Sequence, residues 1–211
     1  MEHSKNVNDY ISLSKGDIPP SAIGNAKRVG TIAWDIETTG LNWKKDLIGT
    51  CQIYIPKDKI YIININDETP VFLQLLLQDD KICKIFHYAP FDLRFMSYCW
   101  SVEPRNVACT KIASKILNPS RRDHSLKTIL QDYLGVMISK DMRLSNWLIT
   151  ELTHNQLAYA AADVFYLPRL FNELKRELIS CNRWNLAEAS FKYLPIRIKL
   201  DILGSNDVFN Y

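Results

Sequence analysis

The stretch that most constrains the fold is residues 31–41, which read TIAWDIETTGL. The apolar run 29–34 leads into two acids, Asp35 and Glu37, and then into a polar turn that contains a glycine. Because side chains alternate along a strand, both acids are expected to point to the same face. Neighbouring carboxylates repel each other and lose hydration there, and a divalent cation between them removes both penalties. Oxygen ligands of this kind suit Mg²⁺ or Mn²⁺, so the stretch predicts the start of a metal site.

Composition narrows the class of protein. The 211 residues, 47% of them hydrophobic, are enough for one large domain with its own core. The net charge of +3 does not favour a broad positive surface for long nucleic acid, although it permits a local basic pocket. The five cysteines are scattered without zinc spacing, which predicts reduced thiols and a cytoplasmic protein. Residues 1–15 lack an apolar signal segment and no apolar run is long enough to span a bilayer, so we expect no membrane association.

The order of apolar patterns predicts an α/β fold. Strands are expected at 29–34, 47–55, 59–65, 81–86 and 107–109, and helices at 71–78, 91–100, 110–117, 126–134 and 155–179. This order predicts a single domain with a mixed central β-sheet flanked by helices. Residues 1–28 are polar and are expected to form an N-terminal arm, followed by the main domain at 29–181. Residues 182–211 are expected to be a C-terminal extension that packs on the domain or between subunits.

Three segments place acids among apolar residues, namely WDIE at 34–37, FDLRF at 91–95 and YAAADVFYL at 159–167. In the third, Tyr159 and Asp163 are four residues apart in a predicted helix, so they share one face. Each residue alone has an ordinary explanation, because Asp92 suits the first turn of a helix and Tyr159 suits a core. An isolated carboxylate in apolar surroundings is costly unless it is paired or binds a metal. Four such acids and a tyrosine together therefore indicate one shared site.

The order Asp-x-Glu, Phe-Asp, Tyr-x-x-x-Asp resembles the motifs of the DEDD exonucleases of the tyrosine type, which have a ribonuclease H-like α/β fold. The wider chain resembles the ribonuclease D group and, within it, the small single-domain nano-RNase C (NrnC) family. The segments that carry this second resemblance are GDIP at 16–19, FHYAPFD at 86–92, CTKIASK at 109–115 and LPIRIKLDILG at 194–204. A histidine-type relative would carry a histidine at the position of Ala158. The resemblance implies a 3′-5′ exonuclease domain at 29–181.

The same resemblance implies hydrolysis of a phosphodiester with the help of two divalent cations, Mg²⁺ or Mn²⁺. Such a pair activates the attacking water and stabilises the leaving oxygen. By similarity, Asp35 would contact both cations, and Glu37 and Asp163 would complete one of the two sites. Asp92 would hold the second cation, and Tyr159 would orient the water.

Four residues near the acids are implied as substrate contacts. Thr38 would contact the terminal nucleotide, and Leu41 would insert between the last two bases, although packing of Leu41 on the sheet explains it equally well. His87 and Tyr88 would contact sugar or base, and His87 also fits a buried structural histidine.

Basic residues further along the chain are candidates for phosphate contacts. The resemblance implies Lys111 and Lys140 for this role. The pair Arg121-Arg122 fits either a solvated loop or a phosphate contact made to a neighbouring subunit. Segment 141–147 reads DMRLSNW, whereas the relatives have a Gln-rich stretch and Ser-Asp-Trp.

The expected activity is therefore a metal-dependent 3′-5′ exoribonuclease that degrades very short RNA, above all dinucleotides, to nucleoside 5′-monophosphates. The resemblance also implies a homo-octamer ring with the tail 194–211 between subunits. An alternative is an exonuclease that trims longer RNA or single-stranded DNA, since contacts to the 2′-OH cannot be read from sequence. A third possibility is a binding protein that kept the fold without catalysis, and the presence of all four acids speaks against it.

Overall fold

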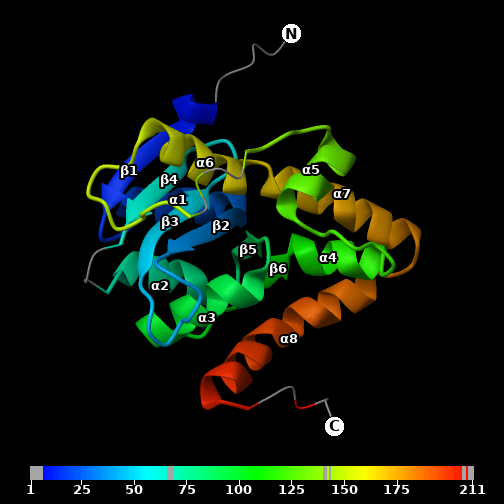
Figure 1. Ribbon diagram of the computed structural model, residues 1–211. Helices are drawn as coiled ribbons and strands as arrows, with labels where there is room; N and C mark the ends of the chain where they lie inside the picture. The colour runs from blue at the N-terminus through cyan, green and yellow to red at the C-terminus, as the bar shows by residue number, and fades with distance from the viewer. Residues whose placement is uncertain (1–6, 66–68, 140–141, 143, 206–207, 209–211) are drawn as a thin grey trace.

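The computed structural model describes residues 7–65, 69–139, 142, 144–205 and 208. Within them, six strands form one mixed sheet with helices on both faces (Figure 1). The sheet order is β1-β4-β3-β2-β5-β6, in which β2, β3 and β4 are antiparallel neighbours and the other pairs are parallel. The strands are β1 (Ile11–Lys15), β2 (Thr31–Thr38), β3 (Ile48–Tyr54), β4 (Ile60–Asn64), β5 (Cys83–Phe86) and β6 (Val107–Cys109).

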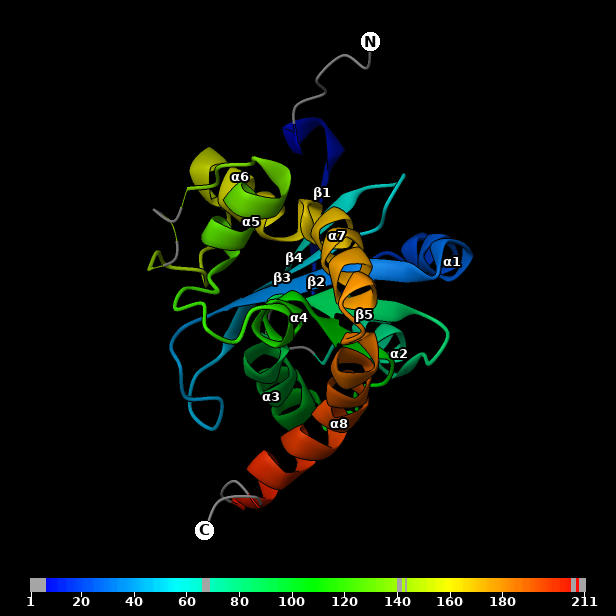
Figure 2. The ribbon, with the colours of Figure 1, turned by 90° about the vertical axis from the view of Figure 1, so that its right-hand side faces the viewer.

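Helices cover the sheet from two sides. The elements are η1 (Val7–Tyr10), α1 (Pro20–Val29), α2 (Val71–Gln78), α3 (Ala89–Trp100), α4 (Thr110–Leu117), α5 (Leu126–Leu134), α6 (His154–Phe165), α7 (Leu167–Ser180) and α8 (Trp184–Leu203). Figures 1 and 2 show the sheet between α6 and α3. Ring contacts agree, because Trp34 of β2 packs on Trp100 of α3, whereas Tyr54 of β3 packs on Phe165 of α6. The predicted α/β fold with a mixed sheet is confirmed.

The central strands fix which side chains share a face. In the antiparallel register, Asp35 lies opposite Gln52 and Glu37 lies opposite Thr50. Directly opposed residues of an antiparallel pair point to the same side, so this polar group faces α6 together with Tyr54. The register shifts between Glu37 and Thr38, which ends the regular pairing just beyond the second acid.

Part of the expected N-terminal arm belongs to the sheet and the core. Strand β1 pairs in parallel with β4, and Ile18, Ala22 and Ala26 are at most 1% exposed. The polar composition misled us because β1 is an edge strand, whose outer positions need no apolar side chain. Helix α1 begins with Pro20 in its first turn and ends at Gly30, whose φ of 73° suits a glycine. Residues 1–6 lie outside the described part of the chain.

The single long helix predicted for 155–179 is wrong in one respect, because the structure has two helices that meet at Tyr166. Pro168 explains the break, since its ring excludes the regular bond to the preceding turn but is tolerated in the first turn of α7. The start of α6 is fixed by a capping box between Thr153 and Gln156. The division places Asp163 near the end of α6, over the sheet.

Much of the C-terminal extension is helical. Helix α8 continues through Pro195 and contacts α3, α4, α7 and β6. Asp201 anchors it by pairing with Arg94 of α3 at 3.8 Å and with Arg197 at 3.0 Å. Over the described residues, we find no helix that combines the length and apolar character of a membrane span.

Candidate metal and catalytic site

The structure brings three of the predicted acids into one cluster. Asp35 and Glu37 come from β2, and Asp163 comes from α6, which lies across β2, β3 and β4. One carboxylate oxygen from each lies within 4.8 Å of the other two. The cluster therefore forms from two acids that point to the same face of β2 and one acid on the helix that covers this face.

Asp92 approaches the same cluster from α3. It lies in the first turn of that helix and is 2% exposed. Its Oδ1 accepts a hydrogen bond of 3.2 Å from the backbone nitrogen of Ile36, which lies between the two acids of β2. Burial raises the pKa of Asp92, the hydrogen bond from Ile36 lowers it, and the charge of Asp163 raises it again. Asp92 therefore lies in the first turn of a helix, where the helix dipole favours an acid, and it also lies close to the other acids.

Tyr159 lies one turn before Asp163 on α6. Burial raises the pKa of its phenol, and the charges of Asp163, Glu37 and Asp35 raise it further. A hydrogen bond between the phenol and Asp163 acts in the same direction. The hydroxyl group therefore stays protonated in neutral solution and lies at the edge of the acid cluster.

The donor set fits hard divalent cations. Carboxylate oxygens are the ligands that Mg²⁺ and Mn²⁺ prefer, and Asp35, Glu37 and Asp163 offer three of them within a few ångströms. Burial raises the pKa of Asp35 well above its usual range, and the neighbouring carboxylates raise it further. Ionised side chains this close are stable together only when a positive charge balances them. The cluster thus has the chemistry of a cation site.

The repulsion among these carboxylates predicts how a bound metal and the pH affect the thermal stability of the protein. A carboxyl group whose pKa is higher in the folded chain stabilises the fold while it is protonated, and this contribution is lost as the pH rises through the raised pKa. We expect the Tm of the metal-free protein to fall as the pH rises above the usual range of a carboxyl group, because the pKa of Asp35 and that of Asp92 are raised chiefly by burial. Carboxylate ligands bind Mn²⁺ in their ionised form, so we expect added Mn²⁺ to raise the Tm more at the higher pH. Thermal melts in chelator and in Mn²⁺, compared at each pH, measure this difference.

Asp35→Asn is the matched control, because the amide cannot ionise. Its metal-free Tm should depend less on pH than that of the wild type, and Mn²⁺ should raise it less. A gain in Tm from Mn²⁺ that stays constant across the pH range would contradict the role of the acid cluster.

Two buried polar residues of β3 belong to this face and were not singled out from the sequence. Thr50 and Gln52 are 0% exposed, and Gln52 Nε2 donates a hydrogen bond of 2.6 Å to Thr50 Oγ1. They lie opposite Glu37 and Asp35 in the sheet. A sequence signal existed, since two polar residues alternate within an otherwise apolar strand.

The two predicted substrate contacts near β2 differ in their exposure to solvent. Thr38 is half-buried at the end of β2, and its Oγ1 donates a 2.6 Å hydrogen bond to the carbonyl of Gly40. Leu41 is 83% exposed in the loop that follows. The alternative in which Leu41 packs on the sheet is therefore wrong, and its side chain is accessible to a ligand.

His87 and Tyr88 follow β5, and they contact Thr110 and Lys111 in the first turn of α4. His87 Nδ1 is 2.9 Å from Thr110 Oγ1, which donates to the carbonyl of Phe86, so the histidine has a structural role. Tyr88 is 44% exposed, and its φ of 70° turns the chain into α3. The ammonium group of Lys111 lies 4.3 Å from the centroid of the Tyr88 ring, within the range of a cation–π contact.

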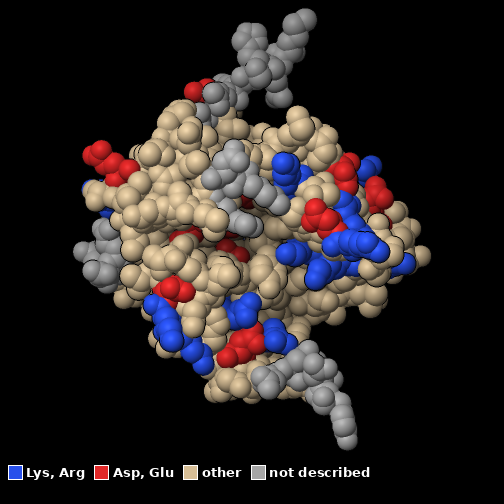
Figure 3. All heavy atoms as spheres, in the orientation of Figure 1, with Lys and Arg blue, Asp and Glu red and all other residues tan. Residues whose placement is uncertain are grey.

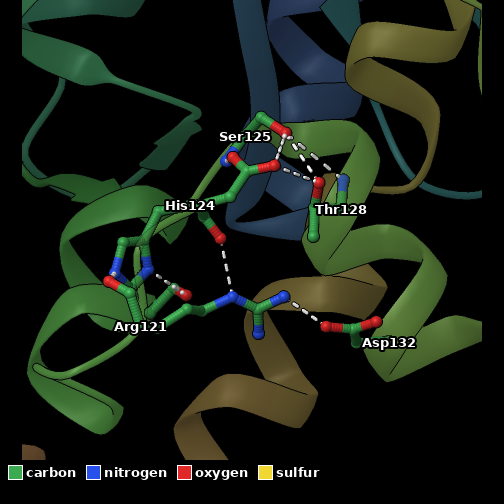
Figure 4. A network of polar contacts seen from close by, with 7 residues as sticks. Arg121, His124, Ser125, Thr128 and Asp132 are labelled. Carbon is green, nitrogen blue, oxygen red and sulfur yellow. Dashed lines mark hydrogen bonds and ion pairs between the residues drawn. The ribbon is translucent and has the colours of Figure 1, made fainter.

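The basic residues further along the chain differ in how they are held. Arg121 donates to the carboxylate of Asp132, as Figure 4 shows, and it also donates to the carbonyl of Asp123 at 2.6 Å. Its guanidinium group is therefore engaged within the α4–α5 region, whereas Arg122 is exposed. Lys140 lies outside the described residues.

The surface around the acids has a clear division of charge. Figure 3 shows Asp and Glu atoms at the bottom of a hollow in the middle of the face, with Lys and Arg atoms gathered beside it over α4 and the following loop. Exposed basic side chains of this region are Lys115, Arg122 and Lys127. A negatively charged chain reaching the hollow would meet positive charge at its rim.

Comparison with known proteins identifies the family. A model described as a 3′-5′ exonuclease matches residues 10–179, a span that starts just before β1 and ends in α7. The chain belongs to the 3′-5′ exonuclease family. The match includes all four acids and Tyr159, and it begins within what we expected to be an arm.

The exonuclease fold is shared over almost the full length with NrnC of Brucella melitensis. The two chains are 37% identical with a TM-score of 0.89, over 96% of this chain and 99% of NrnC. NrnC bound to pGG gives 37% identity and a TM-score of 0.88, over 95% and 98% of the two chains. NrnC with bound Mg²⁺ gives 36% identity and a TM-score of 0.87, also over 95% and 98%.

Curated relatives are longer than this exonuclease-family chain. Ribonuclease D of Desulfotalea psychrophila is 31% identical over 157 residues, which are 70% of this chain and 41% of the relative. Mouse exosome complex component 10 is 33% identical over 102 residues, or 48% of this chain and 11% of the relative. These similarities confirm the resemblance to the DEDD exonucleases, the ribonuclease D group and NrnC.

Proposed function

We propose that the chain is a metal-dependent 3′-5′ exoribonuclease that hydrolyses very short RNA, above all dinucleotides, to nucleoside 5′-monophosphates. The observation that carries the proposal is the cluster of Asp35, Glu37 and Asp163, with Asp92 and Tyr159 beside it. Support for the substrate class comes from NrnC, a relative of nearly the same length that has been observed with pGG and with Mg²⁺.

In this proposal, Asp35, Glu37 and Asp163 hold one cation and Asp92 contributes to a second. Bound Mg²⁺ or Mn²⁺ would neutralise the phosphodiester and supply an activated water. The acids must be ionised for this, and the hydrogen bond from the backbone of Ile36 favours the ionised form of Asp92. The sheet and α6 hold these oxygens in place before substrate arrives, which lowers the cost of reorganisation during the reaction.

Tyr159 is proposed to orient the attacking water. Its phenol lies next to Asp163 and stays protonated because burial raises its pKa. A neutral hydroxyl can donate and accept a hydrogen bond but is a poor base at neutral pH. Its contribution is therefore the position of the water and not the removal of its proton.

The proposed substrate contacts surround the acids. Thr38 would face the terminal nucleotide and Leu41, which is 83% exposed, would insert between bases. Tyr88 presents an exposed ring for stacking or a sugar contact, with His87 behind it, and Lys111 would bind phosphate next to that ring. Lys140 is proposed for phosphate by resemblance alone.

The decisive experiment compares turnover of a diribonucleotide, a long single-stranded RNA and single-stranded DNA, each 5′-labelled, with Mg²⁺ or Mn²⁺. We expect the diribonucleotide to be cleaved fastest, and activity to disappear in chelator. Faster trimming of the long RNA or the DNA would replace the proposed function with that of a broader exonuclease. Absence of hydrolysis with both cations would favour a binding protein that kept the fold.

The assembly and location are part of the proposal. Helix α8 exposes Leu186, Ile196 and Leu203 by 54%, 54% and 72%, an apolar surface that subunit contacts would cover. We propose a homo-octamer ring, which native mass spectrometry should detect, and a monomer mass would contradict it. The five free cysteines agree with a location in the reducing cytoplasm.

A further inference from the structure

The segment between α5 and α6 places a buried indole against the phenol of Tyr159. Trp147 is 1% exposed, and its ring centroid lies 6.0 Å from that of Tyr159 at an angle of 40°. Within the described residues, the buried Nε1 of Trp147 has no hydrogen-bond partner. The contribution of this indole is thus packing rather than hydrogen bonding.

Tyr159 also lines an open hollow of about 440 Å³. Two alanines of α6 and the side chains of Met137, Ile138 and Met142 line the same hollow. Within the described residues, Trp147 is the aromatic ring that packs on Tyr159. Because the indole is buried whereas the hollow is open, Trp147 is the neighbour that we consider as the support of the phenol.

Trp147 in turn is fixed by the backbone of β3. A Cβ atom on Gly49 would lie 2.6 Å from the carbonyl oxygen of Trp147 and 2.9 Å from its carbonyl carbon and its Cβ. Real Cβ atoms do not approach other atoms this closely, so the contact exists because residue 49 has no side chain. Glycine inside a strand is the signal from which this contact could have been expected.

Two further attachments hold the segment on either side of Trp147. Asn64 Nδ2 of β4 donates a 2.9 Å hydrogen bond to the carbonyl of Ile149. Gln156 Nε2, in the first turn of α6, donates to the carbonyl of Asn146 at 2.9 Å and to Ser145 Oγ at 3.2 Å. The segment is therefore tied both to the sheet and to the helix that carries Tyr159.

We propose that Gly49 and Trp147 are positioning residues for Tyr159. Gly49 lets the segment approach β3, which places the indole, and the indole sets where the phenol hydroxyl lies relative to Asp163. Neither residue touches substrate or metal. The inference rests on the proposed function, because the position of the phenol matters for the reaction only if Tyr159 orients water.

Gly49→Ala tests the inference, because the added methyl group must displace Trp147 while every acid stays in place. We expect kcat to fall about tenfold with little change in KM, since a shift of the order of an ångström misplaces the phenol. The affinity for Mn²⁺, measured by calorimetry, should stay at the wild-type value. Gly24→Ala is the matched control, because a Cβ there meets nothing within 4 Å, and it should keep wild-type kcat.

A double-mutant cycle with Tyr159→Phe distinguishes this role from a general loss of structure. Gly49→Ala should slow the wild type but add no loss in the Tyr159→Phe background. An equal loss in both backgrounds, or an unchanged kcat in Gly49→Ala, would overturn the inference alone. Wild-type turnover in Tyr159→Phe would overturn the role of Tyr159 in the proposed function and the inference with it. Should Gly49→Ala fail to fold, Trp147→Phe takes its place in the same cycle.

Discussion

Asp163→Asn is expected to abolish hydrolysis while the fold remains intact. Asp163 is the only described cluster member that comes from α6, and its carboxylate oxygen lies within 4.8 Å of oxygens from Asp35 and Glu37. An amide in its place removes one negative ligand, so we expect kcat to fall by about 10³-fold or more. Calorimetry should also show weaker binding of Mn²⁺.

The same variant should be no less stable than the wild type without metal, because the charge of Asp163 raises the pKa of both Asp35 and Asp92. Removing it relieves repulsion among buried acids. Glu173→Gln on the exposed side of α7 is the control for the loss of one carboxylate, and it should keep full activity. Turnover near the wild-type value in Asp163→Asn would refute the proposed site.

Tyr159→Phe is expected to lower kcat by about 10²-fold, the usual contribution of one well-placed group to proton transfer or water positioning. The substitution removes the hydroxyl group that bonds to Asp163 and keeps the ring that packs on Trp147. KM, the Mn²⁺ affinity and the Tm should change little. Steady-state kinetics on a diribonucleotide, together with a thermal melt, measure these quantities.

Tyr133→Phe on α5 is the control for this change, because Tyr133 is half-buried and lies on another helix. The pH dependence offers a second check. The pKa of Tyr159 is raised by burial, so ionisation of the phenol should not appear in the wild-type pH–rate profile at neutral pH. A rate in Tyr159→Phe equal to that of the wild type would show that the water is positioned by other groups.

The acids of the site could be predicted from sequence because each lies in a short pattern with a clear geometry. Asp35 and Glu37 are two residues apart on one strand and so share a face, and Tyr159 and Asp163 are one turn apart on one helix. These local periodicities survive folding unchanged. Neither pattern alone shows that these acids meet in space. That prediction depended on the order of all three segments along the chain.

The errors came from residues whose role depends on distant partners. Ser12 and Ser14 look unlike a core strand, yet β1 pairs with β4 some fifty residues later. Gly49 and Trp147 are almost a hundred residues apart, so the glycine can signal a close approach but no local pattern identifies Trp147 as the partner. Pro168 caused a different error, because the residue itself breaks the helix. The apolar periodicity continues past Pro168, although one helix ends just before it and a second one begins there.

The placement of Asp163 on α6 has a consequence for biosynthesis. A nascent chain that has grown only to the end of α5 already carries Asp35, Glu37 and Asp92 but lacks the helix that completes the cluster. Since domains fold largely as units while they leave the ribosome, the three carboxylates can come together only after most of the polypeptide has emerged. Any activity that depends on this cluster therefore begins only when synthesis of the domain is nearly finished.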